Sequence, residues 1–159
     1  MKILDMLTAK LLRLYRPGYL PEPIFFEMCR LNTLSSVEII IRKSGSDRVF
    51  LEERNDKYFG NVWHIPGTMV RGNESPDDAF YRLAETLIGK ISKSKEPIAH
   101  NFSYYHKTKR GSIMHHVVFA DGGDTNCGVN GLKDFSLKRL PKNTLNYHRN
   151  ILKRIDFEH

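Results

Sequence analysis

The chain has 159 residues, of which 27% are charged and 40% are hydrophobic. These proportions are ordinary for a folded protein and argue against disorder, and no apolar run approaches the ~18 residues of a membrane-spanning helix. The length predicts one compact domain with a single core, and the formal net charge of +7 favours anionic partners such as phosphates, nucleotides or nucleic acid, with no membrane partner expected.

The first predicted element is an amphipathic helix over residues 2–15. Its apolar residues recur at helical spacing: Ile3, Leu4, Leu7, Leu11 and Leu14. Such a stripe indicates core packing or a dimer contact rather than a membrane anchor. Pro21 and Pro23 then predict an extended linker. We therefore divide the chain into an N-terminal helix and linker, residues 1–34, and one domain, residues 35–159.

The remaining elements alternate between strands and helices. Strands are predicted over residues 36–42 and 48–54, around a turn at 44–47. A helix follows over residues 76–88, because Ser75 is a good N-cap, Pro76 suits the first helical position and Gly89 ends it. Strands over 98–108 and 113–120 and a last helix over 144–157 complete the pattern. This order predicts an α/β (α+β) fold with a mixed sheet between helices and an extra N-terminal helix.

A motif lies between the second strand and the end of the helix. Trp63-His64-Ile65-Pro66-Gly67-Thr68 is followed by Glu74, Arg82 and Gly89 in fixed register. These residues resemble the signature of the Nudix hydrolases, which cleave nucleoside diphosphates linked to some other group. The resemblance implies a Nudix-like mixed sheet sandwiched between helices. It also implies that Glu74 and Arg82 pair and brace the loop and helix.

The three glutamates that hold Mg²⁺ in this family are replaced. Their positions are occupied by Leu83, Thr86 and Leu87. Since Mg²⁺ requires oxygen ligands and residues four apart share one helix face, Leu83 and Leu87 predict a hydrophobic face instead. Glu85 is predicted to point away from that face. We therefore assign no metal ligand, and Mg²⁺ or Mn²⁺ is implied only if the chain is an active enzyme.

Arg82-Leu83 also resembles the Arg-Leu variant found in the GDP-mannose hydrolases. Those enzymes hydrolyse the sugar bond with a reduced metal site and use a histidine base from the loop before the last helix. Tyr147-His148-Arg149 lies in about that region. They keep a metal glutamate where this chain has Leu87, so the resemblance suggests nucleotide sugars as substrates but does not supply a mechanism.

Six residues form the predicted site. Glu74, Arg82 and His64 are the candidate catalytic residues, with His64 the histidine to mutate first because it precedes Pro66-Gly67. The residues expected beside the ligand are Arg54, Gly67 and Thr68. Arg54 lies where the family often keeps a basic residue.

Other histidines and aromatic residues remain open candidates. His115 and His116 are adjacent on a predicted strand, so they point to opposite faces of the sheet. One of them, with His100 and His106, forms either a base or metal site or an ordinary set of surface and core residues. Tyr104 and Tyr105 either stack on a base or sugar or pack within the sheet.

Charge and cysteine content set the remaining expectations. Basic residues gather at Lys90, Lys93, Lys95, Lys107, Lys109, Arg110, Lys138, Arg139 and Lys142. These clusters either bind a phosphate-containing small molecule or nucleic acid, or form a solvated surface. Cys29 and Cys127 have no metal-binding spacing and are expected to be free thiols in a cytoplasmic protein. The sequence predicts no oligomeric state.

Two functions remain open. The first is a Nudix-type hydrolase of nucleoside diphosphate derivatives, with nucleotide sugars among the candidates and a degenerate metal site. The second is a catalytically inactive Nudix-fold module that binds a nucleotide, nucleic acid or protein. The retained motif residues Pro66, Gly67, Glu74, Arg82 and Gly89 favour the first function, and the replacement of all three metal glutamates favours the second.

Overall fold

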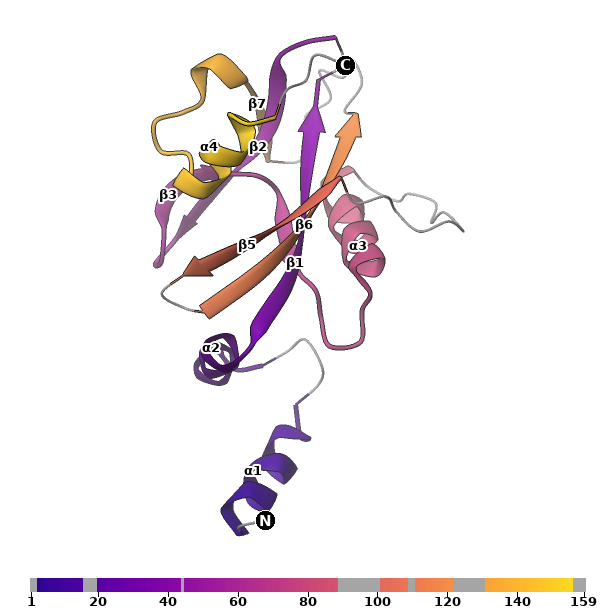
Figure 1. Ribbon diagram of the computed structural model, residues 1–159, viewed down its shortest axis with the longest axis vertical. Coiled ribbons are helices and arrows are strands. Elements are labelled where there is room, and N and C mark those ends of the chain that lie inside the picture. Colours follow the sequence, from indigo (N-terminus) through magenta and orange to yellow (C-terminus); the bar gives the residue numbers. More distant parts are fainter. Residues whose placement is uncertain are drawn as a thin grey trace.

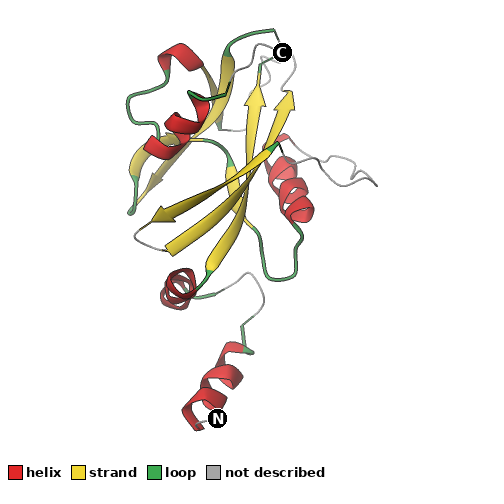
Figure 2. Ribbon diagram, viewed as in Figure 1, coloured by secondary structure: helices red, strands yellow, loops and turns green. Residues whose placement is uncertain are grey.

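The computed structural model describes residues 3–15, 20–43, 45–88, 101–108, 111–121 and 131–155. In this part the chain forms a mixed sheet flanked by helices (Figures 1 and 2). The strands are β1 (Thr33–Arg42), β2 (Arg48–Asp56), β3 (Gly60–His64), β4 (Gly67–Met69), β5 (Phe102–Thr108), β6 (Gly111–Asp121) and β7 (Leu132–Ser136). The helices are α1 (Ile3–Leu12), α2 (Glu22–Leu31), α3 (Pro76–Ile88), α4 (Asn146–Leu152) and the short 3-10 helix η1 (Leu137–Arg139). This arrangement confirms the predicted fold class.

The sheet is built around β1. Its main strand order is β3-β2-β1-β6-β5, and β4 and β7 pair with β1 and β2 outside that path. The β1–β6 pair is parallel, whereas the other pairs of named strands are antiparallel. This register places His115 opposite both Ser36 on β1 and Tyr104 on β5.

Alternating residues of β1 face two separate hydrophobic clusters. Ile39 and Ile41 pack with Leu83 and Leu87 of α3 on one face of the sheet. Ile40 belongs to the cluster on the opposite face, which includes Leu152 of α4. This alternation follows from the two-residue period of a strand, and burial of both faces explains why Ile39, Ile40 and Ile41 are apolar without alternation.

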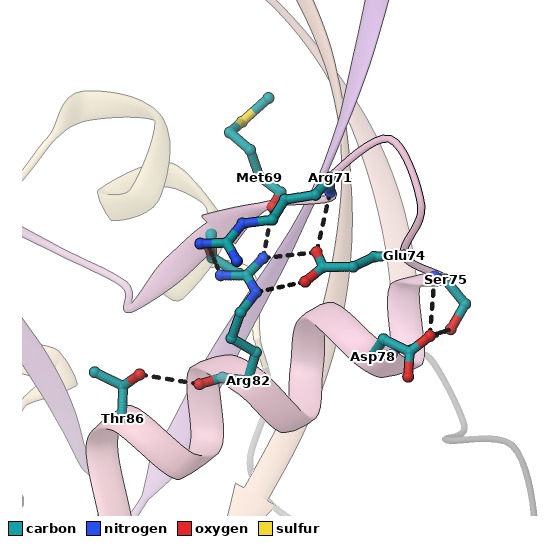
Figure 3. Close-up of polar contacts among 8 residues, drawn as sticks. Met69, Arg71, Glu74, Ser75, Asp78, Arg82 and Thr86 are labelled. Carbon is teal, nitrogen blue, oxygen red and sulfur yellow. Dashed lines mark hydrogen bonds and ion pairs between the residues drawn. The ribbon is translucent and has the colours of Figure 1, made fainter. Parts of the chain in front are cut away.

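The helix predicted over residues 76–88 is confirmed as α3. The Asp78 amide donates to the Ser75 hydroxyl at 3.1 Å. The Ser75 amide donates to the Asp78 carboxylate at 3.2 Å (Figure 3). These bonds satisfy two donors at the helix start, so the N-cap prediction for Ser75 is also confirmed. Gly89 lies outside the described residues.

The linker predicted around Pro21 and Pro23 is wrong. Pro21 is instead the N-cap of α2, and Pro23 occupies its first turn, where a missing amide hydrogen removes no intrahelical bond. The end of α2 packs against β6, since a Cβ on Gly111 would lie only 1.9 Å from the carbonyl oxygen of Cys29. Gly111 has a φ of 136°, so glycine meets both the steric and the backbone requirement.

Helix α1 forms within the predicted range, and the side chains that the structure describes on it, from Met6 onward, lie outside the core. It ends at Leu12, and the side chains of Leu7, Leu11 and Leu14 are more than half exposed. The core-packing alternative is therefore wrong for these three leucines. Figure 1 shows α1 beyond α2, away from the sheet. None of the helices in the described ranges is long and apolar enough to cross a membrane.

The remaining differences concern boundaries and short strands. β1 begins at Thr33, before the predicted strand start, and α4 covers only the middle of the predicted last helix. The short strands β3, β4 and β7 were not expected. The predicted strand over residues 98–108 begins at Phe102, and its earlier part, including His100, falls outside the described residues.

Candidate functional site

A bidentate ion pair joins the loop before α3 to the helix itself. The guanidinium of Arg82 donates from Nε to Glu74 Oε1 at 2.6 Å and from Nη2 to Glu74 Oε2 at 2.8 Å (Figure 3). The same carboxylate accepts the Arg71 amide at 3.0 Å. These hydrogen bonds, above all those from Arg82, lower the pKa of Glu74 below its usual value. The pairing implied by the family resemblance is therefore present.

Arg82 also holds the short strand that precedes the loop. Its Nη1 donates to the Thr68 hydroxyl at 2.9 Å, and its Nη2 donates to the Met69 carbonyl at 2.9 Å. One planar guanidinium thus connects α3, β4 and the intervening loop. Glu74 and Arg82 consequently act as structural braces beside the site.

The helix face that would hold a metal ion in a Nudix hydrolase belongs to the core. The Leu83 and Leu87 side chains are 8% and 5% exposed, and both pack in the cluster with Ile39. The Thr86 hydroxyl donates to the Arg82 carbonyl, and Glu85 is exposed. Across the described ranges, no group of three or more His, Cys, Asp or Glu residues could hold a metal ion. The residues of α3 therefore do not fit Mg²⁺ or Mn²⁺, which need oxygen ligands.

A cavity of about 220 Å³ lies between α2, the sheet and α4. Its polar lining comes from Ser36, Glu38, Arg54, His64, Thr68, His115, Tyr147 and His148. Its apolar and aromatic lining includes Phe25, Phe26, Leu34, Phe59, Ile65 and Ile113. Apolar walls with a few convergent polar groups are typical of small-molecule sites.

Glu38 is the central polar residue of this cavity. Its carboxylate accepts the Tyr104 hydroxyl at 2.7 Å and His148 Nε2 at 2.9 Å, and His115 Nδ1 lies 2.9 Å away. Burial alone would raise the pKa of Glu38. Electrostatic attraction to the imidazole N–H groups of His148 and His115, together with their hydrogen bonds, outweighs burial and holds this pKa well below its usual range, so the group is a carboxylate.

The glycine of the motif is required by close contact with Glu38. Gly67 pairs with Glu38 across the β1–β4 ladder. A Cβ on Gly67 would lie 3.0 Å from Glu38 Cγ and 3.3 Å from the Val37 carbonyl oxygen. Glycine therefore lets β4 approach the buried carboxylate, which is a packing role for the Pro66-Gly67 sequence.

His64 lines the cavity as a neutral imidazole. Burial, which outweighs the hydrogen bond to the Ile65 carbonyl, lowers the pKa of His64 to about 4. Its Nδ1 therefore donates to that carbonyl, at a distance of 2.7 Å. Its ring stacks with His148 at a centroid separation of 6.0 Å.

The structure separates the predicted site residues into two groups. His64, Arg54, Gly67 and Thr68 line the cavity, whereas Glu74 and Arg82 are not among its lining residues. The Arg54 guanidinium forms an ion pair with Asp56 and lies over the Phe59 ring, with its carbon 4.9 Å from the centroid. Arg54 is thus placed at an aromatic wall of the cavity.

The histidine alternatives are also resolved in part. His115 is buried beside Glu38, whereas His116 hydrogen-bonds Ser103 and Ser35 on the other side of the strand. His106 lies near His115, with ring centroids 6.0 Å apart, and burial lowers its pKa. His148 lies within α4, inside the predicted last helix, whereas the base histidine of the GDP-mannose hydrolases comes from the loop before that helix.

Sequence reasoning missed Glu38 and the aromatic residues of α2. Glu38 is a single carboxylate inside the apolar run of β1, and that isolation was a usable signal, because a charge in a buried strand needs partners. No comparable signal pointed to Phe25 and Phe26 as cavity residues, because they lie on a helix whose first-turn prolines resemble a linker. Tyr104 packs inward on Glu38, whereas Tyr105 is exposed and donates to the Ser112 hydroxyl.

Comparison with known proteins places this geometry in a known fold. No family model and no curated protein matches the chain. Among solved structures, a MutT Nudix hydrolase from Burkholderia pseudomallei matches with a TM-score of 0.61 and 19% identity, over 79% of this chain and 99% of the other. A MutT/Nudix family protein from Enterococcus faecalis matches with a TM-score of 0.56 and 20% identity, over 96% of this chain and 67% of the other.

A third match shows the same fold outside a protein described as a hydrolase. A chain in the crystal structure of the complex between the C-terminal domain of mouse MUTYH and human PCNA aligns with a TM-score of 0.57 and 10% identity, over 77% of this chain and 86% of the other. These identities are low, so the likeness concerns architecture rather than activity. The chain has the fold of the Nudix hydrolases.

Proposed function

We propose that this protein is a Nudix-fold module that binds a nucleoside diphosphate derivative in the cavity beside Glu38 without metal-dependent hydrolysis. The observation that carries this proposal is the burial of Leu83 and Leu87 in the core. Because these side chains occupy two of the three metal positions of the motif and the third is Thr86, none of these positions on α3 offers a carboxylate to a cation.

The cavity supports a ligand with a planar ring and an anionic group. Phe25, Phe26 and Phe59 supply aromatic surface, and Tyr147 lines the same cavity. Arg54 is the cationic side chain in the lining that is suited to phosphate, because its guanidinium can donate two parallel hydrogen bonds. Its ion pair with Asp56 leaves the side chain 41% exposed.

Isothermal titration with ADP, GDP, UDP and their sugar derivatives tests the proposal. We expect equal affinity in Mg²⁺ and in chelator, and no release of phosphate or sugar above a buffer control. Arg54→Gln should weaken binding, whereas Arg48→Gln is a matched control, because Arg48 pairs with Asp134 outside the cavity lining. Binding that requires Mg²⁺, or an unchanged affinity in Arg54→Gln, would contradict the proposal.

Hydrolysis is the second candidate, because the Glu74–Arg82 brace of the Nudix motif is intact. In that case a cation, Mg²⁺ or Mn²⁺, would have to be held by residues outside α3. Release of phosphate or sugar from the same panel, dependent on metal and lost in Glu74→Gln, would favour this candidate. Tight, salt-sensitive binding to RNA would instead point to the basic clusters, of which Lys138, Arg139 and Lys142 are exposed.

A further inference from the structure

His115 has one ring nitrogen in use and one without a partner. Its Nδ1 lies 2.8 Å from the Ser36 hydroxyl and 2.9 Å from Glu38 Oε1. Its Nε2 is buried and has no hydrogen-bond partner among the described residues. The whole residue is 4% exposed and lines the cavity. A buried polar atom without a partner costs free energy, so this nitrogen requires an explanation.

The neighbours of Glu38 determine which nitrogen of His115 carries the proton. Glu38 is ionised and can only accept hydrogen bonds, so the Nδ1 of His115 must carry a hydrogen. The other imidazole on this carboxylate has both nitrogens occupied. His148 Nδ1 accepts the Ile65 amide at 3.1 Å, and its Nε2 donates to Glu38.

The free nitrogen of His115 is therefore an acceptor. A second proton on the ring would place a charged N–H donor without a partner inside the protein, which costs far more than a neutral acceptor without a partner. Glu38 does not need that second proton, because it already receives hydrogen bonds from Tyr104, His148 and His115. The neutral ring, with hydrogen on Nδ1, is the favoured form.

Aromatic rings fix the plane of the imidazole. The Tyr104 ring stacks on His115 with centroids 4.4 Å apart and an interplanar angle of 7°. The Tyr147 centroid lies 5.9 Å away on the α4 side. With its face covered by Tyr104 and its Nδ1 held by Glu38, the ring of His115 is fixed in the wall of the cavity, with Nε2 buried and unpaired among the described residues.

We propose that Nε2 of His115 accepts a hydrogen bond from a ring N–H or amino group of a planar heterocycle, so that the cavity selects nucleotides whose base offers a donor. This inference rests on the proposed nucleotide binding and names the atom that reads the base. Glu38 acts as a positioning residue, because it fixes the tautomer of His115 without contacting the ligand through this bond.

Matched nucleotides test the hydrogen bond directly. ADP is compared with purine riboside 5′-diphosphate, which lacks the amino group, and UDP with N3-methyl-UDP, in which the ring donor is blocked. Isothermal titration is performed in chelator on the full chain. We expect the parent of at least one pair to bind about tenfold more tightly than its analogue, in line with one hydrogen bond.

Two variants show whether His115 is the source of that preference. His115→Phe keeps a planar ring without nitrogen, so the ratio within the pair should fall to about one while the analogue still binds. His116→Phe is the matched control, because the neighbouring histidine faces the other side of β6, and it should keep the tenfold ratio. The wild-type ratios test the inference even if His115→Phe does not fold.

The possible results distinguish a failure of this inference from a failure of the proposed nucleotide binding. Equal affinities within both pairs for the wild-type protein would overturn the role of His115 and leave nucleotide binding intact. A preference retained by folded His115→Phe would also overturn it. Failure of ADP, GDP and UDP to bind at all would instead refute the proposed function, and the inference with it.

Discussion

Glu38 places a negative charge inside the sheet, and its partners make that position sensitive to substitution. Glu38→Gln would turn two amide hydrogens toward groups that now donate to a carboxylate. Because this change leaves buried donors without acceptors, we expect a loss of about 3–5 kcal/mol in the free energy of unfolding. Urea unfolding at pH 7 measures this loss.

The matched control for that substitution lies on the neighbouring strand. Glu53 is an exposed carboxylate on β2, so Glu53→Gln should change the free energy of unfolding by no more than about 0.5 kcal/mol. Equal effects of the two substitutions would show that the hydrogen bonds to Glu38 contribute little to stability.

His64 gives the protein a specific dependence on pH. Its pKa of about 4 in the folded chain is below the ordinary value of 6.5, so the unfolded chain binds the proton more readily. The free energy of unfolding should therefore fall as pH decreases from about 6.5 to about 4, by up to about 1.4 kcal/mol per pH unit. Glu38, whose pKa is also lowered, adds a further loss of stability below about pH 4.5.

Urea unfolding of the wild type and of His64→Gln at pH 7, 6 and 5 isolates the histidine contribution. The variant cannot titrate at this position, so its free energy of unfolding should depend less steeply on pH over this range. The difference in slope is specific to His64, since His106 titrates in both proteins. Parallel curves would contradict the burial-driven shift.

At the scale of elements, helix α3 keeps the sequence frame of a metal site but packs as a core helix. Leu87→Glu puts a carboxylate where the Nudix motif carries a metal glutamate, and it places that carboxylate against Ile39 and the rest of its cluster. We expect a loss of more than about 4 kcal/mol, because the charge has no partner there. Thr86→Glu is the control, since Thr86 is exposed and a glutamate there meets solvent.

Thermal unfolding in Mg²⁺ and in chelator distinguishes the two interpretations of this face. If α3 is only a core helix, the melting temperature of Leu87→Glu will be low and the same in both solutions. An increase in its melting temperature on adding Mg²⁺ would mean that residue 87 still faces a cation site.

The ion pair at the start of α3 is a second test at this scale. Arg82→Lys keeps the charge but removes the planar fork that contacts Glu74, Thr68 and Met69. We expect a loss of about 1–3 kcal/mol and faster hydrogen exchange of the Arg71 and Glu74 amides. Arg139→Lys, at an exposed position of η1, should change neither quantity.

The sequence predicted those elements whose signals are local. Ser75 and Pro76 set the start of α3 because capping acts within one helical turn, and the apolar run of β1 identified the central strand. Helix α2 was missed because prolines in a first turn resemble a linker. The motif pointed to His64, Gly67 and Thr68 as residues of the candidate site. The pairing of Glu38 with His115 and His148 could not be predicted, because it depends on how β1, β6 and α4, which are far apart in the sequence, are aligned in the fold.

At the scale of the whole molecule, the cavity depends on α2 as well as on the sheet. Phe25, Phe26 and Cys29 line it from that helix. Glu22 holds α2 to the turn after β2 through an ion pair with Lys57 at 2.8 Å and a hydrogen bond from Tyr58. Residues before the predicted domain start at position 35 therefore contribute to the candidate site, and the first strand itself begins at Thr33.

Two truncations separate the roles of the first two helices. Removal of residues 1–19 deletes α1, whose Leu7, Leu11 and Leu14 are more than half exposed, and should change the free energy of unfolding by no more than about 0.5 kcal/mol. Removal of residues 1–32 also deletes α2 and exposes the aromatic wall of the cavity, so the melting temperature and the affinity for nucleotide should both fall. Thermal unfolding and isothermal titration measure these effects. A large loss of stability from the shorter truncation would show that the leucine stripe of α1 is buried in solution, as the dimer-contact alternative requires, and size-exclusion chromatography at increasing concentration would then detect the dimer.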